Sequence, residues 1–154
     1  MPEKRLFGIW LVAAYFFVKA AFLGTQVVTA MGDVSARSDA IKTIGDLLPL
    51  VSRLDTGPSS SLALAALFVV FGTIVGVCIL IRQRWAAAYV VAFHGIALVW
   101  FLLATLGLHF VGLPKSPDAI SSPYARYEIV ASVLMVTYLL QPRVMRAFGF
   151  SEED

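Results

Sequence analysis

Two basic side chains lie inside long apolar stretches of this sequence and are the first candidates for chemistry. Lys19 comes thirteen residues after Leu6, or about 20 Å along a helix that rises about 1.5 Å per residue. His94 comes nine residues after Trp85, or about 14 Å along its own helix. If the two helix faces align, a Lys19–His94 pair at similar depth could serve an anion or proton path. The commoner fate of such a lysine is snorkelling to the inner interface, or bonding to backbone carbonyls of a neighbouring helix or a partner subunit.

Glu128 is the third candidate for an intramembrane polar site. It is the only acidic residue inside an apolar stretch, and it stands near the outer end of the last one, beside Arg126. We expect an interfacial carboxylate paired with Arg126 or with the outer loop. A role in proton coupling is the weaker alternative, because coupling residues usually lie deeper in the membrane.

The residues that could bind a metal ion or a haem do not form a recognisable site. His94 and His109 are fifteen residues apart, which places them about 22 Å apart on one broad helix face. One haem between helices needs an axial ligand from each side, and the sequence has no second His pair. No cluster has metal-ligand spacing, so we expect no cofactor and no metal.

The composition indicates where these residues reside. The chain has 154 residues, of which 59% are hydrophobic and 14% charged, with a mean hydropathy of +0.82. Soluble domains have roughly 45–50% apolar and about 25% charged residues. The apolar excess excludes a small aqueous domain and a disordered chain. A disulfide scaffold is excluded because Cys78 is the only cysteine.

Four segments are long and apolar enough to span a bilayer, which takes about 20 residues. They lack the two-residue alternation of barrel strands, so they should be helices. The first resembles a secretory signal, but its length and Lys19 favour a retained helix. We therefore expect one all-α domain over 1–154, a four-helix transmembrane bundle. Its spans are 6–31, 62–81, 85–113 and 124–141.

The outer loop 32–61 is long for a connection. Ile41, Ile44, Leu48 and Val51 recur in it at spacings of three and four, which predicts an extracytoplasmic amphipathic helix on the membrane surface. Pro49 should kink or split that helix. The alternative is a partly ordered loop that packs on the bundle.

The basic residues predict the orientation. With the N-terminus inside, six Lys and Arg residues lie on the inner side, all close to span ends, whereas five lie outside, three of them in the long loop. The positive-inside rule then places both termini in the cytoplasm. The inner turn Arg82-Gln83-Arg84 is so short that the helices it joins should be antiparallel neighbours.

Small residues recur on two of the predicted spans, at positions that favour close helix packing. Such faces pack either within the bundle or against another chain, and the sequence does not separate these alternatives. The positions are Ala20, Gly24, Ala65, Gly72 and Gly76.

Two motifs carry a resemblance. Arg82-Gln-Arg-Trp85 opens one helix, and Tyr138-Leu-Leu-Gln-Pro142-Arg-Val-Met-Arg-Ala-Phe148 lies close to the end of the chain. Together they resemble uncharacterised small four-helix proteins of the bacterial inner membrane. The resemblance implies that location and brings no activity with it.

The leading functional hypothesis is an accessory, assembly or scaffolding subunit of a larger membrane complex. Its partners would be the lipid bilayer and other membrane subunits or further copies of the chain. The alternative is a small oligomeric transporter or channel for an anion or protons that uses Lys19 and His94. An enzyme acting on lipid or quinone has the least support, and the few, scattered basic residues do not suit nucleic acid.

Overall fold

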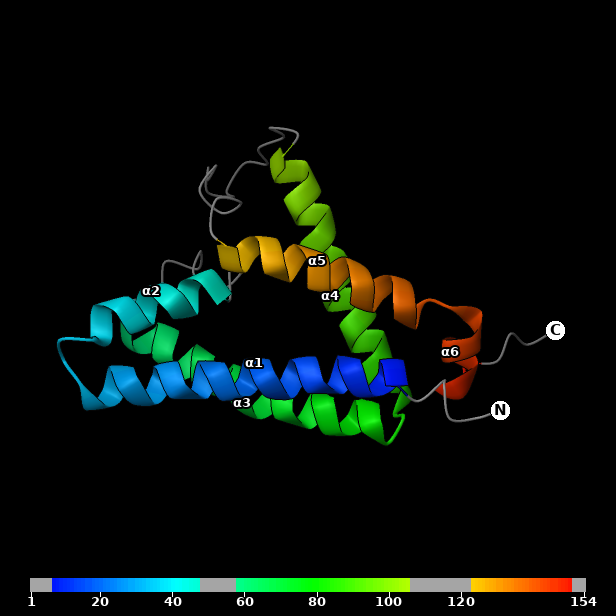
Figure 1. Cartoon of the computed structure of the whole chain (residues 1–154), viewed down its shortest axis with the longest axis horizontal. Helices are drawn as coiled ribbons and strands as arrows, with labels where there is room; N and C mark the ends of the chain where they lie inside the picture. Colours follow the sequence, from blue (N-terminus) through cyan, green and yellow to red (C-terminus); the bar gives the residue numbers. More distant parts are fainter. Residues whose placement is uncertain (1–6, 48–57, 106–122, 151–154) are drawn as a thin grey trace.

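Figure 1 shows the computed structural model of the chain, which describes residues 7–47, 58–105 and 123–150. All regular structure in these ranges is helical, which confirms the predicted all-α class. The helices in chain order are α1 (Phe7–Gly32), α2 (Arg37–Leu47), α3 (Pro58–Leu80), α4 (Arg84–Thr105), α5 (Pro123–Leu139) and α6 (Pro142–Ala147).

Within the described ranges, three helices are long and apolar enough to cross a membrane. They are Phe7–Gly32, Ser61–Leu80 and Arg84–Leu103, and they correspond to the first three predicted spans. Residues 106–113 of the third predicted span lie outside the described residues. The fourth predicted span contains α5, whose 17 residues fall short of the roughly 20 that a full span needs. A four-helix transmembrane bundle is therefore not confirmed.

Helices α1 and α3 form the most extensive helix pair, and they run antiparallel (Figure 1). A Cβ atom built on Gly72 would lie 3.9 Å from the Cβ of Ala20, and one on Gly24 would lie 3.9 Å from Val69. At Gly76 the corresponding distance to the Phe17 ring is 3.1 Å. Small side chains let the two backbones approach closely, so these small-residue faces pack against each other within the chain.

Helix α5 runs antiparallel to α1 on the side away from α3 (Figure 1). Long side chains make the contacts between them, in one consistent register. A Cβ atom on Gly8 would overlap the Tyr138 ring, Lys19 meets Glu128, and the Phe22 and Tyr124 rings lie 6.3 Å apart. The two helices are thus held along their length by side chains that reach across.

Helix α4 leaves the α1–α3 pair soon after the tight turn and crosses α5 (Figure 1). The helices predicted to be antiparallel neighbours contact each other through side chains near the turn and diverge further from it (Figure 1). Aromatic rings lie between them, with Phe71 and Tyr89 4.9 Å apart and Phe68 and Phe93 6.3 Å apart. These bulky rings prevent the close approach that small residues allow between α1 and α3.

The amphipathic helix predicted within residues 32–61 is present as α2. Before it, Asp33 Oδ1 accepts hydrogen bonds from the Ser35 hydroxyl (2.6 Å) and the Ser35 backbone N–H (2.8 Å), which lower the pKa of Asp33. The helix folds back along the C-terminal part of α1 (Figure 1) and buries Ala40 and Ile44. Leu48, Pro49 and Val51 lie outside the described residues. Its position on a membrane surface stays a prediction.

The two ends of the described chain lie at the same end of the molecule as the α3–α4 turn (Figure 1). One apolar cluster joins the start of α1, the end of α3, the start of α4 and the end of α5 to α6, through Ile9, Ile79, Ala86, Leu139 and Val144. A second cluster, at the other end of α1, contains Leu23, Ile44 and Ala65.

The α3–α4 turn contains a strained residue. Arg82 has a φ of 60°, in the left-handed region that glycine adopts without penalty. The Gln83 N–H donates to the Cys78 carbonyl and the Arg82 N–H to the Ile79 carbonyl. This pattern is the helix-ending Schellman motif, in which glycine usually occupies the left-handed position.

Replacing Arg82 by glycine should therefore stabilise the protein by about 1 kcal/mol, because the side-chain penalty of the left-handed conformation is removed. The measurement is the thermal unfolding midpoint in detergent. Arg82→Ala is the control, since it removes the charge and keeps the strain. Equal midpoints for the glycine and alanine variants would contradict this account of the turn.

Candidate functional site

The candidate site begins on α1, where two polar residues stand one helical turn apart in an apolar sequence. Tyr15 and Lys19 are four positions apart and therefore share a face. The Lys19 ammonium donates to Glu128 Oε2 on α5 at 2.6 Å, and the Tyr15 hydroxyl donates to the same oxygen at 2.7 Å. Lys19 Nζ also donates to the Tyr15 hydroxyl at 3.2 Å. One carboxylate oxygen thus collects two donors from α1.

This ion pair is largely withdrawn from solvent. The side chains of Lys19 and Glu128 retain 17% and 8% of their exposure. A single charge near the middle of a bilayer costs at least about 2.5 kcal/mol, and a hydrogen-bonded pair of opposite charges avoids leaving either one uncompensated. The Lys19 ammonium also lies 5.6 Å from the centre of the Tyr15 ring, within the range of a cation–π interaction.

Helix α5 supplies a second polar residue to the site. Ser132 follows Glu128 by one helical turn, and its Oγ lies 2.8 Å from Nδ1 of His94 on α4. Both residues are buried, with 2% and 3% of their surface exposed. One atom of this pair donates and the other accepts, according to the histidine tautomer. Helix α5 therefore bonds to α1 through Glu128 and to α4 through Ser132.

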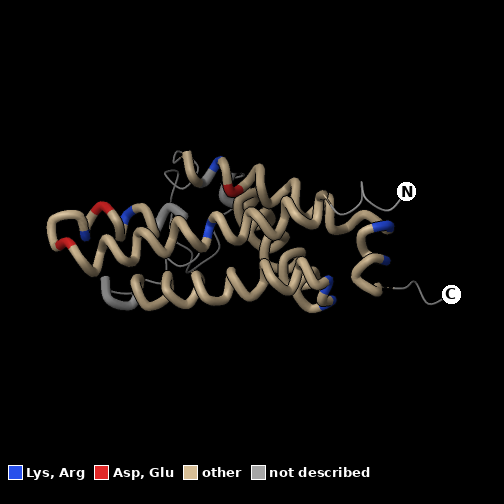
Figure 2. The backbone as a smooth tube through the Cα atoms, turned by 60° about the horizontal axis from the view of Figure 1, so that its bottom comes forward, with Lys and Arg blue, Asp and Glu red and all other residues tan. Residues whose placement is uncertain are grey.

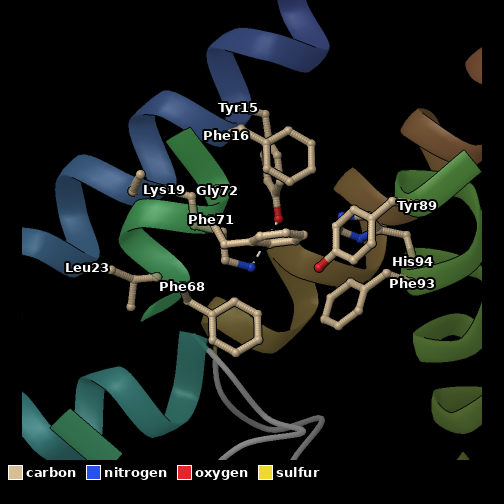
Figure 3. Close-up of a pocket in the computed structure, with 11 residues that line it drawn as sticks. Tyr15, Phe16, Lys19, Leu23, Phe68, Phe71, Gly72, Tyr89, Phe93 and His94 are labelled. Carbon is tan, nitrogen blue, oxygen red and sulfur yellow. Dashed lines mark hydrogen bonds between the residues drawn. The ribbon is translucent and has the colours of Figure 1, made fainter. Parts of the chain in front are cut away.

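Aromatic side chains surround the polar residues. His94 has the rings of Phe93, Tyr15 and Phe16 at centroid distances of 5.5, 6.0 and 6.0 Å. Figure 3 shows Lys19, Tyr15 and His94 around one small cavity between α1, α3 and α4. The cavity has a volume of about 40 Å³, enough for about one water molecule. The rest of its wall is Phe16, Ala20, Leu23, Phe68, Phe71, Gly72, Tyr89 and Phe93.

The structure brings the three sequence-selected polar residues together. Lys19 and His94 line the same cavity, and Glu128 bonds to Lys19. From the sequence, Arg126 or the outer loop was the expected partner of Glu128, and Lys19 was expected to pair with His94, to snorkel to the inner interface or to bond to carbonyls of a neighbouring helix or subunit. The Lys19–Glu128 pair was not predicted, because nothing in one sequence gives the register of α5 against α1.

Two residues of the site were missed. Tyr15 and Ser132 were passed over because tyrosine and serine are common in membrane helices and carry no charge. The signal was their spacing, since each stands four positions from a selected residue, Lys19 or Glu128, on the same helix face. A polar pair at this spacing in an apolar helix marks the face that meets a polar partner.

The part of the chain that the structure describes contains no group of three His, Cys, Asp or Glu side chains able to hold a metal ion. His109 lies outside the described residues. The cluster offers a carboxylate, an ammonium, a phenol and an imidazole–hydroxyl pair. Such groups can hold helices together, and they can accept or pass on a proton.

The chain was compared with protein-family models, with curated proteins and with solved structures, and nothing matches it.

The ion pair predicts a strong energetic coupling between α1 and α5. Glu128→Gln should lower the free energy of unfolding by about 3 kcal/mol, because it leaves the Lys19 charge without a counter-charge. Lys19→Met should have a similar cost. The double variant Lys19→Met/Glu128→Gln should lose clearly less than the sum, and unfolding in mixed micelles, followed by tryptophan fluorescence, measures all three.

The matched control is Lys42→Met on α2, where the side chain is exposed. It removes the same charge and should change the stability by less than about 0.5 kcal/mol. Additive losses in the double variant would show that the two residues act independently, against the structure.

Proposed function

We propose that this chain is a four-span protein of the bacterial inner membrane that serves as an accessory or scaffolding subunit of a larger membrane complex. Both termini would lie in the cytoplasm. In this proposal the segment 124–141, which holds most of α5, makes the fourth crossing, and α2 lies on the outer face.

The distribution of charge supports this topology. The start of α1, the α3–α4 turn and α6 lie at one end of the molecule, as an even number of crossings requires. Among the described residues, Figure 2 shows basic residues at this end in the α3–α4 turn and in α6, whereas acidic residues accompany the basic ones at the other end. An excess of arginine near helix ends is typical of the cytoplasmic side.

The exposed face of α4 around Gly95 is the main observation in support of an accessory role. A Cβ atom on Gly95 would meet nothing within 4 Å, and Ile96 and Val99 beside it are 66% and 57% exposed. A small residue flanked by large apolar ones is the surface that membrane helices use to associate. The small residues of α1 and α3 already contact the opposite helix, whereas this α4 face is open to a transmembrane helix of another subunit.

The polar residues between α1, α4 and α5 support the same role. The charges of Lys19 and Glu128 are paired with each other, and the cavity beside them has room for about one water molecule. A cluster of this kind fixes the positions of α1, α4 and α5, as a scaffold requires.

The test is purification from native membranes in mild detergent. We expect a membrane partner in stoichiometric amount, and we expect Gly95→Leu to lose it, since the added side chain fits the lone chain and blocks a close helix contact. The control is Gly32→Leu, because Gly32 also has open space around it. A partner retained by both variants would contradict the α4 site, and a monomer without partners would contradict the accessory role.

A second candidate function is proton movement through the cluster, favoured by one observation. Lys19, Tyr15 and His94 line a single cavity with room for a water molecule, and intramembrane ionisable groups often form proton relays. An anion path has less support, because the Glu128 carboxylate already compensates the Lys19 charge.

Proteoliposomes that contain a pH-sensitive dye test this second function. Proton movement should fall at least ten-fold in Glu128→Gln and should be unchanged in Thr137→Ala, a change on an exposed part of the same helix. Flux equal to that of empty liposomes would exclude proton movement as the function.

A further inference from the structure

An apolar groove lies between α4 and the corner formed by α5 and α6. It encloses about 280 Å³, and all of its lining side chains are apolar. Ala88 and Ala92 form the α4 side, whereas Leu140, Met145 and Phe150 belong to the other side. Short alanine side chains facing long flexible ones leave a slot whose chemistry suits an alkyl chain.

A positive charge is held at the rim of this groove. The Arg84 guanidinium lies 5.2 Å from the centre of the Phe150 ring, and Phe150 is part of the groove lining. The turn at Gly149, with φ of +78°, brings the backbone to the same side chain, since a Cβ there would lie 3.6 Å from Arg84 Nε. These contacts place the Arg84 charge beside the groove, although the residue itself is exposed.

Three more arginines lie at this end of the molecule (Figure 2), and all are exposed: Arg82, Arg143 and Arg146. The acidic residues within the described ranges lie elsewhere, in the α1–α2 turn, in α2 and in α5 at Glu128. The sequence continues after Phe150 with the acids Glu152, Glu153 and Asp154, which lie outside the described residues. The lipid-binding experiment therefore uses the full chain, which includes these three acidic residues.

We propose that the groove binds an anionic phospholipid, with one acyl chain between α4 and the α5–α6 corner and the phosphate beside Arg84. Basic sites between helices on the cytoplasmic side are suited to anionic headgroups, and charge complementarity favours such a lipid over an apolar helix here. The proposal rests on the membrane placement proposed above and is independent of the accessory role. The groove lies near the arginine end of α4, about one to two turns before Gly95 and two to three turns before Val99.

Native mass spectrometry of the delipidated full-length protein tests the proposal. Phosphatidylglycerol should bind about five-fold more tightly than phosphatidylcholine with the same acyl chains, which corresponds to the roughly 1 kcal/mol that a basic residue contributes at an anionic surface. Arg84→Gln should abolish this preference, and Arg84→Lys should retain most of it. Ala88→Trp should weaken both lipids by filling the slot, and soluble glycerol phosphate should not compete.

The control is Arg37→Gln on α2, which removes the same charge at the other end of the molecule and should leave the preference intact. Equal binding of the two lipids, or an undiminished preference in Arg84→Gln, would overturn the proposal. Displacement by glycerol phosphate would also overturn it, by showing that the acyl chain is not required. Release of the protein from membranes by alkaline carbonate would contradict the membrane placement itself, whereas a membrane-bound protein without lipid preference would contradict only the lipid site.

Discussion

The ion pair between Lys19 and Glu128 is the interaction on which the helix arrangement depends. Lys19 stands near the middle of α1, where an uncompensated charge is costly, and a hydrogen-bonded carboxylate beside it offsets that cost. Glu128 supplies this carboxylate at 2.6 Å, and the Tyr15 hydroxyl adds a second donor to the same oxygen. The pairing fixes the register of α5 on α1, and Ser132, one turn further on, then fixes α5 on His94 of α4.

The α1–α3 pair and the α3–α4 pair are packed in two different ways. Small residues bring α1 and α3 together, with Gly72 opposite Ala20, whereas aromatic rings such as Phe71 and Tyr89 keep α3 and α4 apart. The small residues give a tight α1–α3 pair. The rings between α3 and α4 leave a cavity beside the ion pair and an uncovered face on α4. The cavity lies where this second kind of packing leaves space between α1, α3 and α4.

The sequence predicts the helices well because apolar length and periodicity are local properties. The first three spans and α2 follow from them within a few residues, apart from the part of the third predicted span that lies outside the described residues. The angle between α3 and α4 does not follow from the sequence, because the short turn at Arg82–Arg84 predicts only that these helices are antiparallel neighbours. The rings of Phe68, Phe71 and Phe93 lie between the two helices, and spacing alone does not distinguish a ring between helices from a ring that faces lipid.

The residues of the candidate site could likewise be predicted from the sequence, whereas their partners could not. Lys19, Glu128 and His94 are conspicuous because charged and imidazole side chains are rare in membrane helices. Their partners depend on the relative rotation and register of helices far apart in the chain, which one sequence does not contain. The i, i+4 spacing from Tyr15 to Lys19 and from Glu128 to Ser132 identifies the polar faces, but it does not say which face meets which.

The most direct test of this account is a distance measurement in lipid bilayers. Solid-state NMR of protein labelled with ¹⁵N-lysine and ¹³C-glutamate reports the dipolar coupling between the Lys19 ammonium and the Glu128 carboxylate. We predict a coupling that corresponds to direct contact and that disappears in Lys19→Met. A native protein without this coupling, whose lysine ammonium signals all exchange freely with water, would contradict the ion pair and the helix arrangement that depends on it.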